Sequence, residues 1–215
     1  YDDIEDLQQI IRDLRAGGAE VNGSCGIHVH VGAENMKPQH FRNLVNIIHG
    51  KEDLIYKALQ VSDNRAKRWC KKIDAGFFDN LNKSKPNTRA KIADLWYKDY
   101  DRCWSRDEHY NSSRYHGINF HATFTKGSVE FRLFNATLHA GRIKAYVQFC
   151  MAVIHQAMTV KKASKQVAHT DNEKYTFRCW LLRLGLIGDE FKTCRSVLLH
   201  NLTGNSAWRH GQIAA

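Results

Sequence analysis

Three short segments of the chain carry polar side chains suited to chemistry at every second position. Residues 25–32 read Cys-Gly-Ile-His-Val-His-Val-Gly, and residues 117–124 and 128–133 alternate in the same way. A period of two is typical of a β-strand with one apolar and one polar face, and side chains two apart lie roughly 6.5 Å from each other. The polar positions are His28, His30, Asn119, His121, Thr123, Glu130 and Arg132.

These residue types favour the binding of metal ions and anions. Imidazole and carboxylate groups are ligands of divalent metals, and arginine binds phosphate or carboxylate through paired hydrogen bonds. Transfer of the γ-phosphoryl group of ATP needs metal ions and cations placed against the developing charge. One such strand alone is typical of a half-exposed sheet with histidines in water. Three in one chain favour a shared site.

The second and third segments predict a β-hairpin. With Lys126–Gly127 as a two-residue turn, Thr123 faces Glu130 and His121 faces Arg132. Polar residues then meet polar residues, whereas a slip by one position would mix the two faces. We therefore expect a connecting loop of even length, with two or four residues.

Most of the remaining chain is expected to be helical. The apolar side of the sheet would pack under these helices, which gives an α+β class: an antiparallel sheet with one polar concave face, packed on helices. Residues 77–86 are expected to form a loop. Helical spacing of apolar residues or helix-start signals occur over residues 3–16, 38–59, 63–72, 88–104, 140–161, 175–184 and 190–200.

Composition limits the classes of partner. The formal charge of +10 favours anionic partners such as nucleotides, phosphates, acidic substrates or nucleic acid. The six cysteines form no CxxC pair, which indicates reduced thiols in a cytoplasmic protein. We find no apolar run long enough to span a bilayer and no signal peptide.

Two groups of residues outside the strands leave alternatives open. The basic run over residues 65–72 is interpreted as a solvated helix face, with contact to phosphates or nucleic acid as the alternative. His139 and Arg142 are either substrate contacts or the first turn of a helix.

The three strands together resemble the amidoligase family of predicted carboxylate–amine ligases with a glutamine-synthetase-like catalytic fold. The resemblance is carried by the HxH strand, by Tyr-His-Gly-Ile-Asn-Phe-His over residues 115–121, and by Val-Glu-Phe-Arg-Leu-Phe-Asn-Ala-Thr-Leu-His over residues 129–139. We accordingly assign residues 1–160 to an amidoligase-like catalytic region and residues 161–215 to a C-terminal helical extension.

The resemblance implies a reaction and roles for the site residues. ATP would phosphorylate a carboxylate with Mg²⁺ present, and an amine would then attack the acyl phosphate. His28 and Glu130 would hold metal ions. The remaining implied roles are catalytic for Arg132, His30 and His121, and nucleotide or substrate contact for His30, Asn119 and Arg132.

One feature of the family is missing from the sequence. Family members open with an ExE strand that carries metal-binding glutamates, and we find no such strand here, so we expect the family's N-terminal strands to be absent from this chain. The expected partners are ATP and a carboxylate–amine substrate pair, which includes peptides or proteins, with no membrane. The alternatives are a basic nucleic-acid-binding protein of a mobile element, and an inactive descendant that binds nucleotide or peptide.

Overall fold

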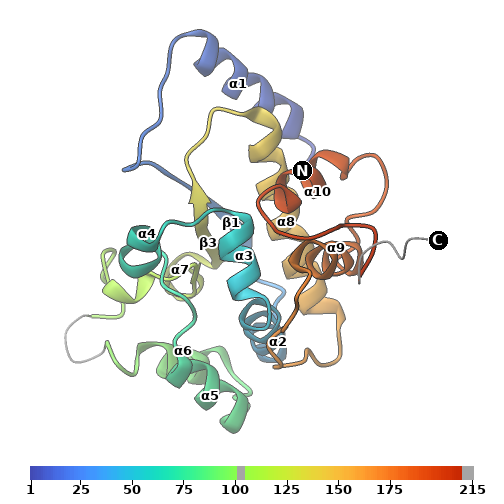
Figure 1. Ribbon diagram of the computed structural model, residues 1–215. Coiled ribbons are helices and arrows are strands. Elements are labelled where there is room, and N and C mark those ends of the chain that lie inside the picture. The colour runs from blue at the N-terminus through green and yellow to red at the C-terminus, as the bar shows by residue number, and fades with distance from the viewer. Residues whose placement is uncertain (101–104, 210–215) are drawn as a thin grey trace.

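A three-stranded antiparallel sheet lies at the centre of the fold. The computed structural model describes residues 1–100 and 105–209 (Figure 1). Strand β3 (Ser128–Asn135) lies between β1 (Gly26–Gly32) and β2 (Ile118–Asn119). The sheet packs against helices, which confirms the predicted α+β class.

Helices account for most of the remaining described chain, largely where the sequence predicts them. Several begin at a side chain that caps the first turn: Ser62, Asp74, Thr88, His139 and Asn172 each accept a hydrogen bond from a backbone N–H of that turn. The α-helices are α1 (Ile4–Ala16), α2 (Pro38–His49), α3 (Glu52–Ala58), α4 (Asp63–Arg68), α5 (Ala75–Ser84), α6 (Arg89–Tyr97), α7 (His121–Lys126), α8 (Ala140–Thr159), α9 (Glu173–Arg183) and α10 (Lys192–Leu199), with a short 3-10 helix at Ser112–Arg114.

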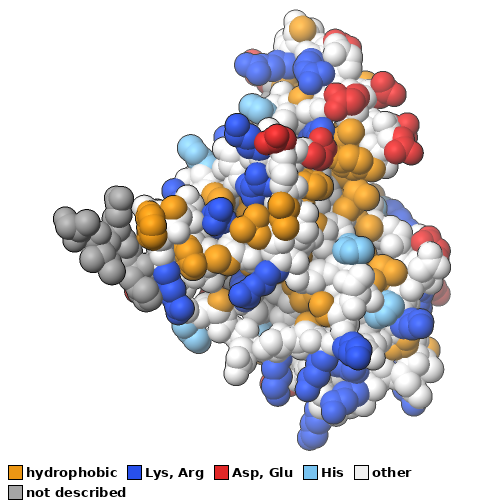
Figure 2. Space-filling view, turned by 90° about the vertical axis from the view of Figure 1, so that its right-hand side faces the viewer, with side chains coloured by type: hydrophobic (Ala, Val, Ile, Leu, Met, Phe, Trp, Pro, Cys, Tyr) orange, Lys and Arg blue, Asp and Glu red, His pale blue; other side chains and the backbone are white. Residues whose placement is uncertain are grey.

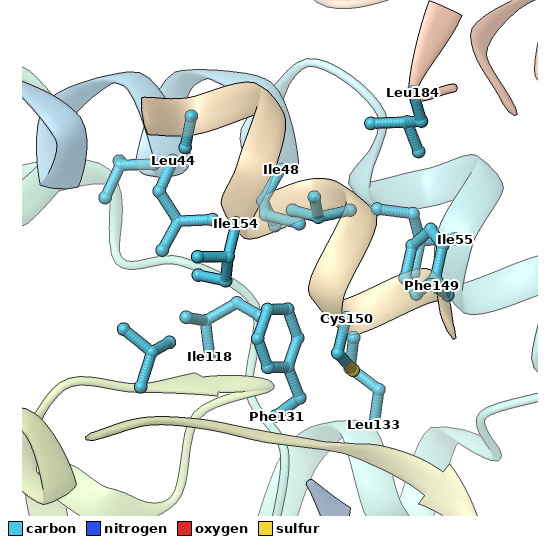
Figure 3. Packing of buried hydrophobic residues seen from close by; sticks show 14 of the residues in the cluster. Leu44, Ile48, Ile55, Ile118, Phe131, Leu133, Phe149, Cys150, Ile154 and Leu184 are labelled. Atoms are coloured by element: carbon cyan, nitrogen blue, oxygen red, sulfur yellow. The ribbon is translucent and has the colours of Figure 1, made fainter. Parts of the chain in front are cut away.

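The main core fills the space between the apolar face of the sheet and helices α2 and α8. Figure 3 shows Phe131 and Leu133 of β3 pointing toward Cys150 and Ile154 of α8. Phe131, Leu133 and Cys150 are at most 1% exposed, so this side of the sheet is closed to water. The polar side chains at alternate positions must therefore project from the opposite face.

The predicted hairpin is wrong. Only Ile118–Asn119 pairs with β3, and the chain then turns into helix α7. The Asn119 side chain accepts a hydrogen bond from the backbone N–H of His121 at 2.8 Å, which starts this turn, and Gly127 ends α7 in the left-handed conformation with φ of 73°. Phe120 and Phe124 are four residues apart, a spacing that suits a helix as well as a strand.

The pairing differs from the prediction by four residues. Asn119, and not Thr123, lies opposite Glu130. The connection, residues 120–127, is even in length as predicted but longer than two or four residues. Because the shift is even, polar Asn119 still faces polar Glu130, whereas His121 and Thr123 of the predicted polar face lie on helix α7.

Three helix predictions also need correction. The helix predicted over residues 63–72 is shorter, because α4 ends at Arg68 and Lys71 forms a β-bridge with His116. Residues 77–86 are not a loop, because α5 runs to Ser84 and buries Phe77, Phe78 and Leu81 on one face. The helix predicted over residues 38–59 is two helices, because α2 ends at His49 and Gly50 follows. A Cβ at Gly50 would lie 2.8 Å from the carbonyl oxygen of Gln166, so the C-terminal part of the chain packs directly on this break. Residues 101–104 of the predicted helix at 88–104 lie outside the described residues.

Buried asparagines of α2 fasten the segment that follows α8. The Asn43 amide donates to the carbonyls of Ala157 and Val160 at 3.1 and 2.8 Å, and its oxygen accepts the N–H of Ala163 at 3.1 Å. Asn43 is 1% exposed, so these bonds satisfy backbone groups that water cannot reach. Helices α9 and α10 then pack beside α8 (Figure 1).

Charge is unevenly distributed over the molecule. On the face drawn in Figure 2, acidic side chains gather near the top, where Figure 1 places α1, and lysines and arginines dominate the lower end. Among residues 1–100 and 105–209, no helix combines the length and the apolarity needed to cross a membrane.

Candidate functional site

Glu130 lies at the centre of the polar face because β3 is the middle strand. His30 of β1 and Asn119 of β2 are its paired neighbours on the two sides. The three polar strands that the sequence predicts therefore meet at one carboxylate. Glu130 is 4% exposed, so its charge must be satisfied by these neighbours.

Each oxygen of the Glu130 carboxylate has close partners. Oε1 lies 2.9 Å from Nη1 of Arg132, 2.9 Å from Nδ1 of His28 and 3.6 Å from Nε2 of His30. Oε2 accepts a hydrogen bond from Nδ2 of Asn119 at 2.5 Å. Arg132, His28, His30 and Asn119, all of them predicted site residues, thus lie close to the predicted site residue Glu130.

The β1–β3 pairing is irregular opposite Arg132. Ile27 pairs with Phe134 and Val29 with Phe131, so His28 faces two residues of β3, namely Arg132 and Leu133. Such a bulge changes the direction of the side chains that follow it. Leu133 and Phe134 can then both be buried although they are consecutive.

Arg132 is held by groups that the strand pattern does not reveal. Its Nε donates to the carbonyl of Trp69 at 3.4 Å, and its guanidinium lies 5.8 Å from the centre of the Tyr115 ring. Arg65, from the basic run, donates to the carbonyl of Arg132 at 3.4 Å. Arg65 also donates to the carbonyls of Cys25 and Phe134, so it ties α4 to β1 and β3.

The cluster favours an ionised carboxylate. Burial raises the pKa of Glu130, but the hydrogen bond from His28, the charge of Arg132 and the hydrogen bond from Asn119 outweigh it and lower this pKa to about 2. Burial lowers the pKa of the Arg132 guanidinium, and the charge of Glu130 opposes that effect. The pair is therefore a buried carboxylate and a buried guanidinium, both charged at neutral pH.

Two histidines near the carboxylate are held neutral at neutral pH. Burial lowers the pKa of His30, whose Nδ1 lies 2.9 Å from the hydroxyl of Ser128. Burial also lowers the pKa of His121, whose Nδ1 lies 2.6 Å from the hydroxyl of Tyr97. A neutral imidazole can accept a proton, so both rings keep the capacity for acid–base work.

His121 stands on helix α7 and not on a strand. It still lines one small cavity of about 20 Å³ together with Asn119 and Glu130. His109, Arg114 and Lys126 line the same cavity, so a guanidinium and an ammonium group flank the single carboxylate. Among the described residues that line the cavity, Arg114 and Lys126 outnumber the one carboxylate, so the net charge of the lining is positive.

Sequence reasoning missed several residues of the site. Ser128 could have been found, because it precedes Glu130 by two positions on the same strand face. Tyr97, His109 and Arg114 come from helical or loop segments with no alternating pattern, so nothing in the sequence places them here. His139 and Arg142 line a different cavity, beyond the end of β3.

The polar face offers few ligands for a divalent cation. Among residues 1–100 and 105–209, no group of three or more histidine, cysteine, aspartate or glutamate side chains has the arrangement of a complete metal site. His28 and Glu130 supply one imidazole and one carboxylate. Mg²⁺ is commonly held through one or two carboxylates together with substrate phosphates, so Glu130 is the side chain here that matches its preference, with the His28 imidazole beside it at 2.9 Å.

Comparison with known proteins identifies one family. The sequence model of the family described as putative amidoligase enzyme matches residues 1–154. The match contains all three strands and ends within α8. No curated protein and no solved structure shows a significant match to the chain.

Proposed function

Because the chain belongs to the amidoligase family, which matches residues 1–154, we propose that it is an ATP-dependent carboxylate–amine ligase that works through an acyl phosphate. Membership of the family makes the chain a ligase of the amide-forming type. The ATP dependence, the intermediate and the residue roles are our proposal.

The observation that carries the proposal is the convergence of Arg132, His28 and Asn119 on the buried Glu130 carboxylate. A solvated polar face would place these side chains in water, and their charges would have little effect on one another. Here Glu130 and Arg132 are 4% and 5% exposed, and the flanking cavity also carries Arg114 and Lys126. Such an environment suits a reaction in which phosphate charge is bound and redistributed.

The residues take the following roles in the proposal. Arg132 binds an oxygen of the transferred phosphoryl group or of the substrate carboxylate, and Asn119 orients Glu130 and contacts the nucleotide. His28 and Glu130 would hold Mg²⁺, which would neutralise phosphate charge during the transfer. His30, 3.6 Å from Glu130, and His121, which lines the cavity, are the neutral bases.

The proposed reaction has two steps. A carboxylate oxygen of the substrate attacks the γ-phosphorus of ATP, the bond to the β-phosphate oxygen breaks, and ADP leaves. The amine then attacks the acyl carbon, the carbon–oxygen bond to phosphate breaks, and inorganic phosphate leaves. The amine loses a proton in this step, and neutral His30 accepts it.

The proposed reaction predicts that the chain releases inorganic phosphate from ATP when both substrates are supplied. The chain is incubated with ATP and Mg²⁺, with pooled carboxylates, pooled amines, or both, and inorganic phosphate is measured. We expect release above background only when both pools are present, because the acyl phosphate is discharged by the amine. Arg132→Gln should reduce the rate at least a hundredfold, and Arg15→Gln, on exposed α1, should not change it.

Different results in this assay, or in a DNA-binding measurement, would favour an ATPase, an inactive descendant or a nucleic-acid-binding protein. Release of phosphate that ignores the carboxylate pool would show an ATPase and contradict the ligase. ATP binding without turnover in any pool would favour the inactive descendant. DNA affinity that falls steeply with salt and is insensitive to Arg132→Gln would favour the nucleic-acid-binding alternative.

A further inference from the structure

A second cavity lies between the end of β3, the start of α8 and helix α10. It has a volume of about 220 Å³ and is separate from the Glu130 site. Asn135, at its edge, lies five residues beyond Glu130 on β3, which corresponds to about 16 Å along a strand. Helix α10 lies outside the residues matched by the family model, so the C-terminal extension closes this cavity.

Three side chains that can carry positive charge line the cavity from two elements. Arg142 and His139 come from the start of α8, and His200 comes from the end of α10. The cavity lining contains no aspartate or glutamate, and the Arg142 guanidinium makes no ion pair with any described residue. The Arg142 guanidinium therefore faces the cavity without a counter-charge.

The hydrogen bond of His139 determines which nitrogen is left for a ligand. Its Nδ1 accepts the backbone N–H of Arg142 at 3.2 Å and caps helix α8. Nδ1 is thus an acceptor, so in the neutral ring the proton is on Nε2, which is free to donate. One ring holds the helix end and still offers a donor.

Two asparagines fix the shape of the cavity lining. Asn135 donates to the carbonyls of Leu59 and Gln60 at 3.3 and 3.0 Å, and Asn201 donates to the carbonyl of Ala58 at 2.9 Å. These bonds fasten the end of α3 to β3 and to the segment after α10. The cavity is therefore pre-formed, and its volume suits a molecule smaller than a typical drug-sized ligand.

We propose that this cavity binds a small molecule carrying a carboxylate or phosphate group, held by Arg142 with His139 and His200. Arginine pairs with either oxyanion through two parallel hydrogen bonds. The site is distinct from the Glu130 cluster and does not depend on the ligase assignment. It gives the C-terminal extension a function in ligand binding.

The test is a titration of the ¹⁵N-labelled full chain with inorganic phosphate and, separately, with succinate, followed by amide chemical shifts. We expect saturable shifts at residues 135–142 and 196–201 with at least one probe, and the two arms distinguish phosphate from carboxylate. Arg142→Gln should weaken this binding at least tenfold. Arg15→Gln, an exposed arginine on α1, should leave it unchanged.

A second variant separates binding from folding. His139→Asn keeps an acceptor for the N–H of Arg142 but removes the Nε2 donor, so it should weaken binding about threefold or more with no loss of thermal stability. Glu130→Gln should leave the affinity unchanged, which makes the result independent of the ligase site. Absence of saturable shifts with both probes, or an unchanged affinity in Arg142→Gln, would overturn the proposal.

Discussion

Replacing Glu130 by alanine is expected to lower the free energy of unfolding by about 3–5 kcal/mol, because it leaves a buried charge without its partner. Arg132 is 5% exposed and loses its carboxylate at 2.9 Å. Its remaining polar partners are the Trp69 carbonyl at 3.4 Å and the Nδ1 of His28 at 3.4 Å, and neither of these groups nor the Tyr115 ring carries a negative charge that would replace the carboxylate. Denaturant unfolding at pH 7 measures the loss.

A double-mutant cycle shows whether the loss comes from the pair. Arg132→Met removes the guanidinium but keeps an apolar stem, so the double variant Glu130→Ala, Arg132→Met should be less destabilised than the sum of the single variants. The exposed control Glu20→Ala should stay within about 0.5 kcal/mol of the parent chain. Additive losses in the cycle would mean that Glu130 and Arg132 do not depend on each other.

Acid should remove the same stabilisation. The pKa of Glu130 is lowered from the ordinary value of 4.5 to about 2 in the folded chain, although burial alone would raise it. A lowered carboxylate pKa stabilises the fold fully above the unfolded value. That contribution, of about 3 kcal/mol, is lost as the pH falls from about 4.5 to about 2. Unfolding free energies measured across this range should show the loss.

Two variants separate the sources of this pH dependence. Glu130→Gln cannot ionise, so its stability should change less between about pH 4.5 and 2 than that of the parent chain. Glu52 changes the stability in the opposite direction, because burial raises its pKa to about 7. Its contribution to the free energy of unfolding therefore falls as the pH rises from 4.5 through 7. Glu52→Gln should therefore flatten only the upper range. An unchanged acid slope in Glu130→Gln would contradict the ionised cluster.

The sequence was sufficient to predict the polar face of the sheet. The alternation of His28 and His30, and of Glu130 and Arg132, is produced by burial of the intervening apolar residues, which a period of two reveals. The register error left Asn119 on the same face as Glu130, because it was a shift of four. The α+β class and most helices follow from the same reasoning.

The remaining site residues could not be predicted because tertiary packing places them. Tyr97 reaches His121 from helix α6, and the Trp69 carbonyl reaches Arg132 from the loop after α4. Helix α7 forms because the Asn119 side chain turns the chain at once after two paired residues. In a segment as short as residues 117–124, strand and helix periods cannot be distinguished.

Titration of the chain with ATP in the presence and absence of Mg²⁺ tests the central claim, that one polar face binds the nucleotide and its metal. His28 suits the test because it is exposed and contacts Glu130 at 2.9 Å. We predict Mg²⁺-dependent binding that weakens at least tenfold in His28→Ala and is unchanged in His169→Ala, which alters an exposed histidine elsewhere. Equal ATP affinity in the parent chain and His28→Ala, or affinity that ignores Mg²⁺, would contradict it.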